Sequence, residues 1–296
     1  MEISELKNYL KNLPNLINND GGKRKERAIK DFRYFCVTYF PHHIGLNVGE
    51  SFNDTSKFRN FIYKNLGNIA KKYSKTLLEA YRGASKTTII SRLFSLWQLL
   101  GDKKDYCVII GASNETITET SETIRTELEE NELLKFDFNI KQGTKWTNEN
   151  FDFTTDNKPK KYRFYGVKKK IRGANFRGKR PDLILCDDIE NDENVESKSQ
   201  RDKLYSWFNK AVLKLPARQN NNYNIIVVGT RLHHDGLLAR LKNSPNFYSL
   251  NFPLVLEFPS NLDKLNAKTL DKADLKSFKI DDERLNKIEK IGRAHV

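Results

Sequence analysis

The chain has few cysteines and no long apolar stretch, and each shortage excludes a class of protein. Among its 296 residues there are 3 cysteines. Cys36, Cys107 and Cys186 lie far apart beside apolar or aromatic residues, and none belongs to a Cys-x-x-Cys pair. This spacing argues against a disulfide framework and against a cysteine zinc site, so we expect reduced thiols in a core.

No apolar run approaches the roughly 20 residues that a membrane-spanning helix requires. Residues 1–13 are charged and lack the apolar centre of a signal peptide. The hydrophobic share of 38% is nevertheless enough to form a sizeable core. The sequence therefore predicts a folded protein of the cytoplasm with no membrane partner.

Positive charge is abundant. The chain has 52 lysines and arginines against 38 aspartates and glutamates, which gives a formal net charge of +14. Basic side chains that neutralise phosphates release counterions, so this excess suits a nucleic-acid partner. Lysine and asparagine are frequent throughout the chain, however, and AT-rich coding alone would produce that bias. The charge by itself leaves both explanations open.

From about residue 75 the chain alternates short apolar strands with helices, which is typical of an α/β domain with a parallel sheet. The expected strands cover residues 76–80, 106–110, 183–186, 224–228 and 248–252, with an antiparallel hairpin formed by residues 150–154 and 162–165. The expected helices cover residues 1–18, 31–40, 86–100, 114–130 and 197–213. We therefore expect a helical N-terminal region over residues 1–70, an α/β domain over residues 71–260 and a linker over residues 261–296.

The first segment that suggests chemistry covers residues 80–88 and reads Ala-Tyr-Arg-Gly-Ala-Ser-Lys-Thr-Thr. A phosphate loop needs inward-facing backbone N–H groups, a lysine that reaches the terminal phosphates and a hydroxyl that binds Mg²⁺. Lys86 and Thr87 supply the two side chains, whereas Ala80 and Ser85 replace the usual glycines and Gly83 provides flexibility. The alternative is a Lys-Thr pair at an ordinary helix start. The position between a buried strand and a buried helix favours the phosphate loop.

The second segment is an apolar strand, residues 183–186, followed by Asp187, Asp188 and Glu190. In P-loop NTPases such a strand holds the Mg²⁺ shell, and a further carboxylate polarises the attacking water. The alternative is an acidic strand end that caps the next turn. Together with Lys86, the segment predicts a Mg²⁺-dependent nucleotide hydrolase, and we expect its cofactors to be ATP and Mg²⁺. The expected fold is a RecA-like P-loop (ASCE-type) NTPase, with a mainly parallel central sheet and helices on both faces.

Two other segments have both a functional and an ordinary interpretation. Thr230 follows the strand 224–228 and could contact the γ-phosphate, or it could simply form a turn. Residues 168–180 form the densest basic run, from which Arg172 could reach a phosphate, or the run could be a solvated loop. The adjacent His233 and His234 do not predict a metal site, because neighbouring histidines on a loop seldom converge and no third ligand is evident.

These four segments, in this order, resemble the ATPase domain of phage-type terminase large subunits, which are DNA-packaging motors. The resemblance extends over residues 30–260 and is most specific from residue 171 to residue 191. Residues 82–87 look like the irregular phosphate loop of that family, and residues 229–231 look like its coupling motif. Residues 35–42 are similar to the region ahead of the family's ATPase core.

The resemblance implies roles for individual residues. Arg82 would sense or orient the γ-phosphate, and Thr87 and Asp187 would bind Mg²⁺. Many family members have glutamate where this chain has Asp188, so Glu190 remains an alternative catalytic carboxylate, although we favour Asp188. The predicted catalytic residues are Asp188, Glu190, Arg82 and Arg172. The predicted ATP-binding residues are Arg82, Gly83, Ala84, Ser85, Lys86, Thr87, Thr88 and Thr230.

The resemblance also implies a process and partners. Mg-ATP hydrolysis would move double-stranded DNA into a procapsid in the host cytoplasm. The partners would be a portal protein, a small terminase subunit and further copies of the chain in a ring. The family's nuclease domain has no counterpart after residue 260, so we expect no nuclease activity from this chain. Residues 291–296 match a translated sequencing-adapter oligonucleotide, and we expect them to have no function.

Two rival functions are compatible with the same residues. Another P-loop motor, such as a helicase or an AAA-type ATPase, would use the same site, but a helicase should have a second RecA-like half and none is visible. A non-catalytic DNA-binding protein with a degenerate nucleotide site would explain the missing glycines. The presence of Lys86, Thr87 and Asp187 argues against that rival.

Overall fold

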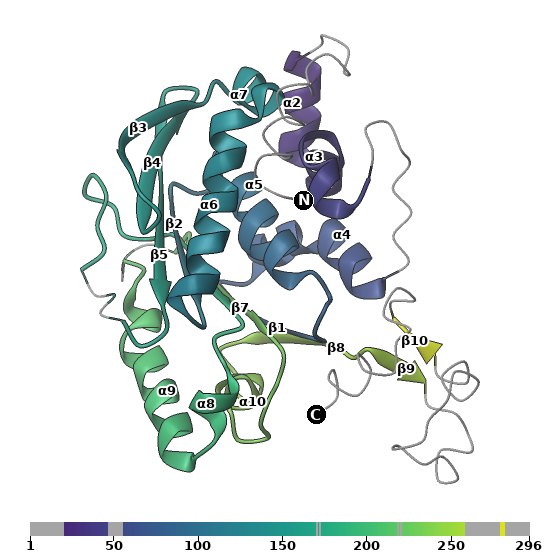
Figure 1. Ribbon diagram of the computed structural model, residues 1–296, viewed down its shortest axis with the longest axis vertical. Helices are drawn as coiled ribbons and strands as arrows, with labels where there is room; N and C mark the ends of the chain where they lie inside the picture. Colours follow the sequence, from purple (N-terminus) through teal and green to yellow (C-terminus); the bar gives the residue numbers. More distant parts are fainter. Residues whose placement is uncertain are drawn as a thin grey trace.

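The structure is a computed structural model that describes residues 21–46, 56–169, 171, 173–217, 219, 221–257 and 279–281. Its centre is an eight-stranded sheet in the order β3-β4-β5-β2-β6-β7-β1-β8 (Figure 1). The strands are β1 (Lys75–Ala80), β2 (Tyr106–Gly111), β3 (Lys141–Trp146), β4 (Asn150–Thr155), β5 (Lys158–Gly166), β6 (Leu183–Asp187), β7 (Asn224–Gly229) and β8 (Tyr248–Phe252). In the order of the sheet, each neighbouring pair is parallel from β5 through β2, β6, β7 and β1 to β8. Strand β4 is antiparallel to both β3 and β5. The predicted mainly parallel sheet and the predicted hairpin are confirmed.

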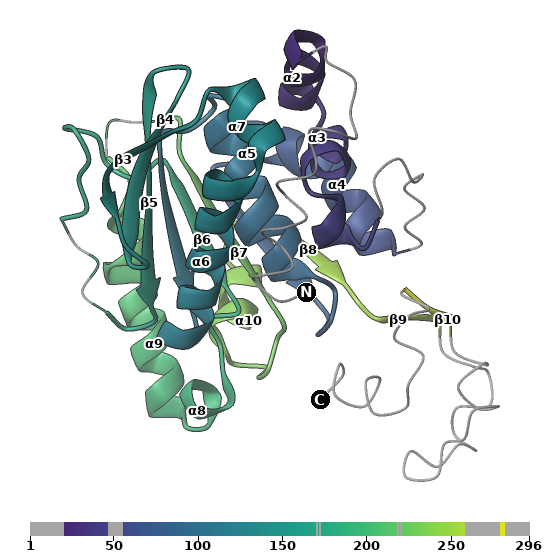
Figure 2. The same cartoon turned by 45° about the horizontal axis from the view of Figure 1, so that its top comes forward.

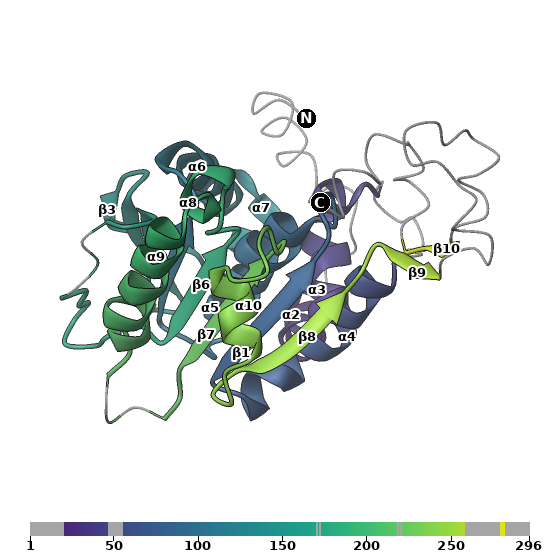
Figure 3. The same ribbon diagram turned by 90° about the horizontal axis from the view of Figure 1, so that it is seen from below.

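Helices cover both faces of this sheet (Figures 2 and 3). On the side of the N-terminal region lie α2 (Gly21–Lys30), α3 (Phe32–Tyr39), η2 (Pro41–Ile44), α4 (Lys57–Lys72), η3 (Thr87–Phe94), α5 (Ser95–Leu100), α6 (Asn114–Glu130) and α7 (Glu132–Phe138). On the opposite side lie α8 (Asp192–Val195), α9 (Lys198–Lys210), η4 (Val212–Lys214) and α10 (Leu237–Lys242). In the part of the chain that the structure describes, no helix has both the length and the apolar character needed to cross a bilayer.

The apolar strands divide their side chains between two cores. In β7, Ile226 and Val228 pack with the N-terminal helices, α5 and α6, whereas Ile225 and Val227 pack with α9 and α10. Successive residues of a strand point to opposite faces, so both faces are apolar only if the strand sequence is apolar without interruption. This requirement explains why the runs that predicted these strands show no polar alternation.

The N-terminal helices share the first core with the sheet. The Phe32 ring of α3 lies 5.4 Å from the Phe94 ring and 5.2 Å from the Trp97 ring, measured between centroids. Arg24 of α2 forms an ion pair with the buried Asp137 of α7, with Nε 2.6 Å from Oδ2, and the Tyr39 hydroxyl donates to the same oxygen. A buried carboxylate needs such partners, because leaving it unpaired would be costly. The described helices before residue 73 are therefore packed against the sheet and its helices.

A short segment late in the chain returns to the first helices. The pair β9 (Val255–Glu257) and β10 (Lys279–Ile280) is followed by Asp281, which is 4% exposed. One of its oxygens accepts from the Lys57 backbone N–H at 2.7 Å, and the other accepts from the Phe58 N–H at 3.2 Å. The Tyr81 hydroxyl also donates to Asp281, at 2.8 Å. Asp281 thus satisfies free N–H groups at the start of α4 and holds the first residue after β1.

Several predicted boundaries need correction. The helix expected over residues 86–100 is continuous, but its first part, η3, is π-helical and only α5 is α-helical. A helix that the sequence did not predict, α2, begins at Gly21, where the backbone lies close to Asp137 and Phe136. The helix predicted for residues 1–18 and almost all of the linker at 261–296 lie outside the described residues. The division of the chain into three regions stays a prediction.

Candidate functional site

The loop between β1 and η3 reverses direction through two left-handed residues. Gly83 has a φ of 85° and Ser85 a φ of 61°. A residue other than glycine in this region costs about 1–3 kcal/mol, which is why glycine is usual at such a position. Despite the substitution, the loop delivers Lys86 to the helix start at the carboxyl edge of the sheet. This edge is where ligands bind in open parallel sheets.

The Lys86 ammonium lies at the centre of this edge. It is 5% exposed, and its Nζ donates to the Tyr81 carbonyl at 3.0 Å and to the Thr230 hydroxyl at 2.9 Å. The same atom lies 3.5 Å from Oδ2 of Asp188. Lys86 thus contacts the loop after β1, the end of β6 and the end of β7. The oxygens of a phosphate group can take the place of these acceptors as hydrogen-bond partners of Lys86.

Asp187 ends β6 and is buried. Burial and the neighbouring Asp188 raise the pKa of Asp187 to about 6, while the hydroxyls of Ser91 and Thr87 and the Lys86 charge act in the opposite direction. Its Oδ1 has no hydrogen-bond partner among the described residues. A buried carboxylate with a free oxygen beside the hydroxyl of Thr87 suits Mg²⁺, which prefers oxygen ligands and would offset the charge. These two residues therefore fit the predicted metal role.

Asp188 turns away from the strand direction. Its φ is 44°, its backbone N–H donates to the Val228 carbonyl at 2.9 Å, and its side chain is 45% exposed. Oδ1 accepts from the Thr230 N–H at 2.9 Å, which leaves Oδ2 facing Lys86 and the solvent. The carboxylate is thus held at the open side of the site, where it can accept a proton from a water molecule.

Glu190 lies in a different environment. It is 6% exposed, and its Oε1 accepts from the Leu238 backbone N–H at 3.1 Å at the start of α10. Burial raises the pKa of Glu190, whereas backbone N–H groups, including those of Leu232 and Leu237, act against the rise. Glu190 therefore anchors the first turn of α10, and this contact favours Asp188 as the catalytic carboxylate.

Thr230 lies between the two motif strands, because β7 pairs with β1 on one side and with β6 on the other. Its hydroxyl donates to the Ala80 carbonyl at 3.0 Å and accepts from Lys86. The next residue, Arg231, forms an ion pair with Glu79, a 4% exposed residue of β1. The sequence analysis did not predict this ion pair, although a glutamate within an apolar strand indicates that a positively charged partner lies nearby.

The remaining predicted site residues fall into two groups. Arg82 extends from the loop, with its guanidinium 3.9 Å from Asp192, while Ala84 is fully buried and Thr88 is half-buried. Arg172 lies outside the described residues. Within the basic run, Lys179 pairs with Asp105, and Arg180 donates to the carbonyls of Lys214 and Leu215. At least these two basic residues of the run therefore bind other residues of the same chain.

Comparison with known proteins gives similarity of structure only. No protein-family model matches the chain, and no curated protein matches it. The ATPase domain of the Thermus phage P74-26 large terminase is 12% identical, with 73% of this chain and 84% of that chain covered and a TM-score of 0.47. The HK97 bacteriophage large terminase is 14% identical, with 91% and 52% covered and a TM-score of 0.49.

The large terminase of a thermophilic bacteriophage, solved in complex with ATP-gamma-S, is 12% identical, with 75% and 48% covered and a TM-score of 0.42. These three solved structures are phage large terminases or an ATPase domain of one. The chain spans about half the length of the HK97 protein and of the protein solved with ATP-gamma-S. At these identities the likeness concerns the fold, so the function has to be argued from the site.

Proposed function

We propose that this chain is the ATPase motor part of a terminase large subunit, which couples Mg-ATP hydrolysis to the translocation of double-stranded viral DNA into a procapsid. One observation carries the ATPase proposal: Lys86, Asp188 and Thr230 contact one another at the carboxyl edge of a parallel sheet. Residues from the helix start after β1, from the end of β6 and from the end of β7 meet there, which an ordinary helix start or strand end would not require.

Each residue then has a chemical task. Lys86 and its neighbours in the loop 82–88 would bind the phosphates, and Thr87 and Asp187 would hold Mg²⁺, which would supply positive charge at the phosphoryl group. Asp188 accepts a proton from the attacking water. Arg82 orients the terminal phosphate from the exposed side, and Arg172 serves as a second phosphate ligand. Thr230 bridges Ala80 and Lys86, so it reports a change at the phosphate to β7.

The assembly is proposed from the family resemblance and from charge. The net charge of +14 supports contact with a DNA backbone. The remaining partners are a portal protein, a small terminase subunit and other copies of this chain in a ring in the host cytoplasm.

A second function is a non-catalytic DNA-binding protein with a degenerate nucleotide site. The observation that favours it is Ser85, which occupies a left-handed conformation where a glycine would be unstrained. A site that still binds and hydrolyses ATP would rule this function out.

Calorimetric titration of Mg-ATP into the folded chain tests the proposal. We expect binding in the micromolar range in the wild type, loss of binding in Lys86→Ala, and unchanged binding in Lys198→Ala, whose lysine is exposed on α9. Binding should also weaken when EDTA removes Mg²⁺. A folded wild type that binds no nucleotide, or a Lys86→Ala variant that binds normally, would contradict the phosphate loop.

A further inference from the structure

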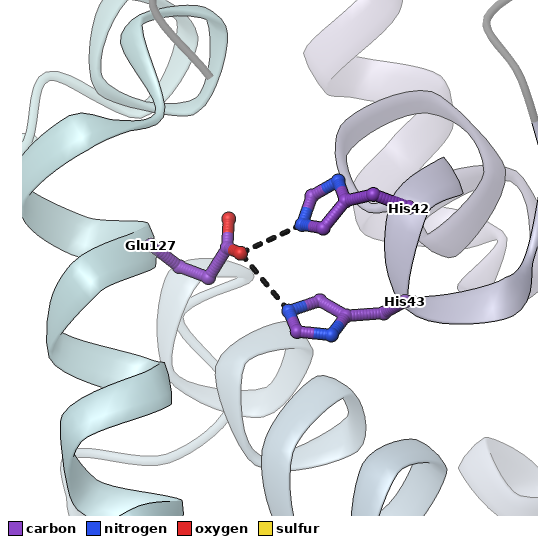
Figure 4. A group of neighbouring side chains, drawn as sticks. All are labelled: His42, His43 and Glu127. Atoms are coloured by element: carbon purple, nitrogen blue, oxygen red, sulfur yellow. Dashed lines mark hydrogen bonds and ion pairs between the residues drawn. The ribbon is translucent and has the colours of Figure 1, made fainter. Parts of the chain in front are cut away.

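A second cluster of metal-ligand side chains lies away from the phosphate loop, where η2 meets α6 (Figure 4). His42 and His43 are consecutive residues of η2, and both direct Nε2 toward the same oxygen of Glu127. The distances to Glu127 Oε1 are 2.8 Å from His42 and 2.9 Å from His43. One ligand atom from each of the three residues lies within 4.8 Å of the others.

The cluster is buried. The side chains are 3% exposed at His42, 12% at His43 and 1% at Glu127. Three side chains that can each bind a metal ion are therefore gathered in a small space with little access to solvent.

Asn131 orients the carboxylate. Its Nδ2 donates to Glu127 Oε2 at 2.9 Å and to the Tyr39 carbonyl at 2.9 Å, and Asn131 is fully buried. One oxygen of Glu127 is thus fixed by a neighbour, while the other faces the imidazoles. Hydrogen bonds of this kind hold ligands in place around metal ions.

We infer that His42, His43 and Glu127 form a zinc-binding site that joins η2 to α6. Two imidazole nitrogens and one carboxylate oxygen are ligands that Zn²⁺ prefers, and three protein ligands leave a fourth tetrahedral position for water. Mg²⁺ and Ca²⁺ prefer oxygen ligands, so they suit this set less well. The positive charge of Arg92 interacts electrostatically with His43 and would oppose a nearby cation. This charge is paired with Glu119 of α6, at 2.9 Å.

The alternative is a tie of hydrogen bonds in which both imidazoles donate Nε2–H to Glu127. The present N–O distances of 2.8 and 2.9 Å are those of hydrogen bonds, and a tetrahedral zinc ion would hold the same atoms roughly 3.3 Å apart, so metal binding requires a small outward shift of the side chains. The two arrangements differ in what the nitrogens carry, a proton or a metal ion. Metal binding by the chain therefore separates them.

The test uses the full chain after removal of metal by a chelator. Titration with Co²⁺ should give the visible absorption of a tetrahedral site with nitrogen and oxygen ligands, and Zn²⁺ should displace it at one ion per chain. Glu127→Gln keeps the shape of the side chain but removes its charge, and we expect it to weaken Zn²⁺ binding by at least about 100-fold. The double variant His233→Ala/His234→Ala is the matched control, because it removes the other adjacent histidine pair and should bind as the wild type does.

Zn²⁺ should also raise the midpoint of thermal unfolding of the wild type but not of Glu127→Gln, because only the wild type gains binding energy in the folded state. A folded wild type that binds no stoichiometric Zn²⁺ overturns the inference, even if Glu127→Gln fails to fold. Binding that the histidine control abolishes, or a thiolate charge-transfer band that indicates cysteine ligands, overturns it as well. None of these measurements involves nucleotide, so their outcome is independent of the proposed ATPase.

Discussion

Asp188 and Glu190 are separated by one residue, and their contacts differ because the backbone turns between them. The left-handed φ of Asp188 directs its carboxylate toward Lys86, whereas Glu190 accepts N–H groups of α10. Neither the alternating side-chain directions of a strand nor the regular side-chain spacing of a helix predicts that these two carboxylates have different partners. The choice between the two carboxylates stays a prediction, which this difference in conformation supports and kinetics can test.

We expect Asp188→Asn to lower the ATP turnover number by about 10²–10⁴-fold, because an amide does not accept the proton of the attacking water. Nucleotide binding should change little, since Lys86 remains in place. Glu190→Gln should instead lower the free energy of unfolding by about 1–2 kcal/mol through a weaker contact with α10. Steady-state hydrolysis and urea unfolding of both variants check this. If Glu190→Gln abolishes turnover in a stable protein, the two roles are reversed.

At the scale of whole elements, a lysine joins α2 to α5. Lys103 lies just after α5, donates to the Ile29 carbonyl of α2 at 2.8 Å and lies over the Trp97 ring. Burial, with a smaller contribution from Lys71, lowers the pKa of Lys103 to about 7. The proton bound by this side chain therefore differs in affinity between the folded and the unfolded chain.

The sign of the pH effect follows from linkage. Between about pH 7 and pH 10 the unfolded chain holds more protons on Lys103 than the folded chain, so the free energy of unfolding should rise with pH. We expect a rise on the order of 1 kcal/mol that is absent in Lys103→Met. Urea unfolding at a series of pH values measures it, with Lys30→Met as a control at an exposed position. Equal slopes in the wild type and Lys103→Met would contradict the buried state of Lys103.

At the scale of the whole molecule, the first core contains residues of α3, α4, η3, α5, α6 and the sheet together. Helices that share a core with a sheet lose their packing when the sheet unfolds, and the reverse also holds. The described N-terminal helices and the α/β domain should therefore unfold as one cooperative unit.

Two tryptophans on opposite sides of the sheet can report this. Trp97 is buried in the first core, and Trp207 packs against the second. Single-tryptophan variants that retain only one or the other should show the same midpoint in urea, and far-UV circular dichroism should agree with both. An earlier transition at Trp97 would mean that the N-terminal helices form a separate unit.

The sequence predicted the central strands because buried parallel strands consist of unbroken apolar residues, as in β6 and β7. It predicted a helix over about residues 114–130, and the structure confirms it as α6, with Ser113 as its N-cap and Asn131 as its C-cap. It did not predict the π-helical turns of η3, because the segment is apolar around most of its circumference and fixes no helical period.

The candidate site was predicted in part. Lys86, Asp187 and Thr230 were identified from their local motifs, because each follows a strand. The cluster of His42, His43 and Glu127 was missed because Glu127 is 85 and 84 residues from the two histidines and meets them only through the packing of η2 on α6. The ion pair of Glu79 with Arg231 depends in the same way on the pairing of β1 with β7.

The contact of Asp281 with the start of α4 has a consequence for the order of folding. Lys57 and Asp281 are separated by 224 residues, and closing so long a loop before the intervening chain is compact would lose much conformational entropy. Contacts of such sequence separation form slowly, after local ones. Tyr81, the first residue after β1, shares this carboxylate, so its hydrogen bond with Asp281 forms only after residues 279–281 have joined the folded chain. The loop that we propose to bind phosphate therefore acquires this support late in folding.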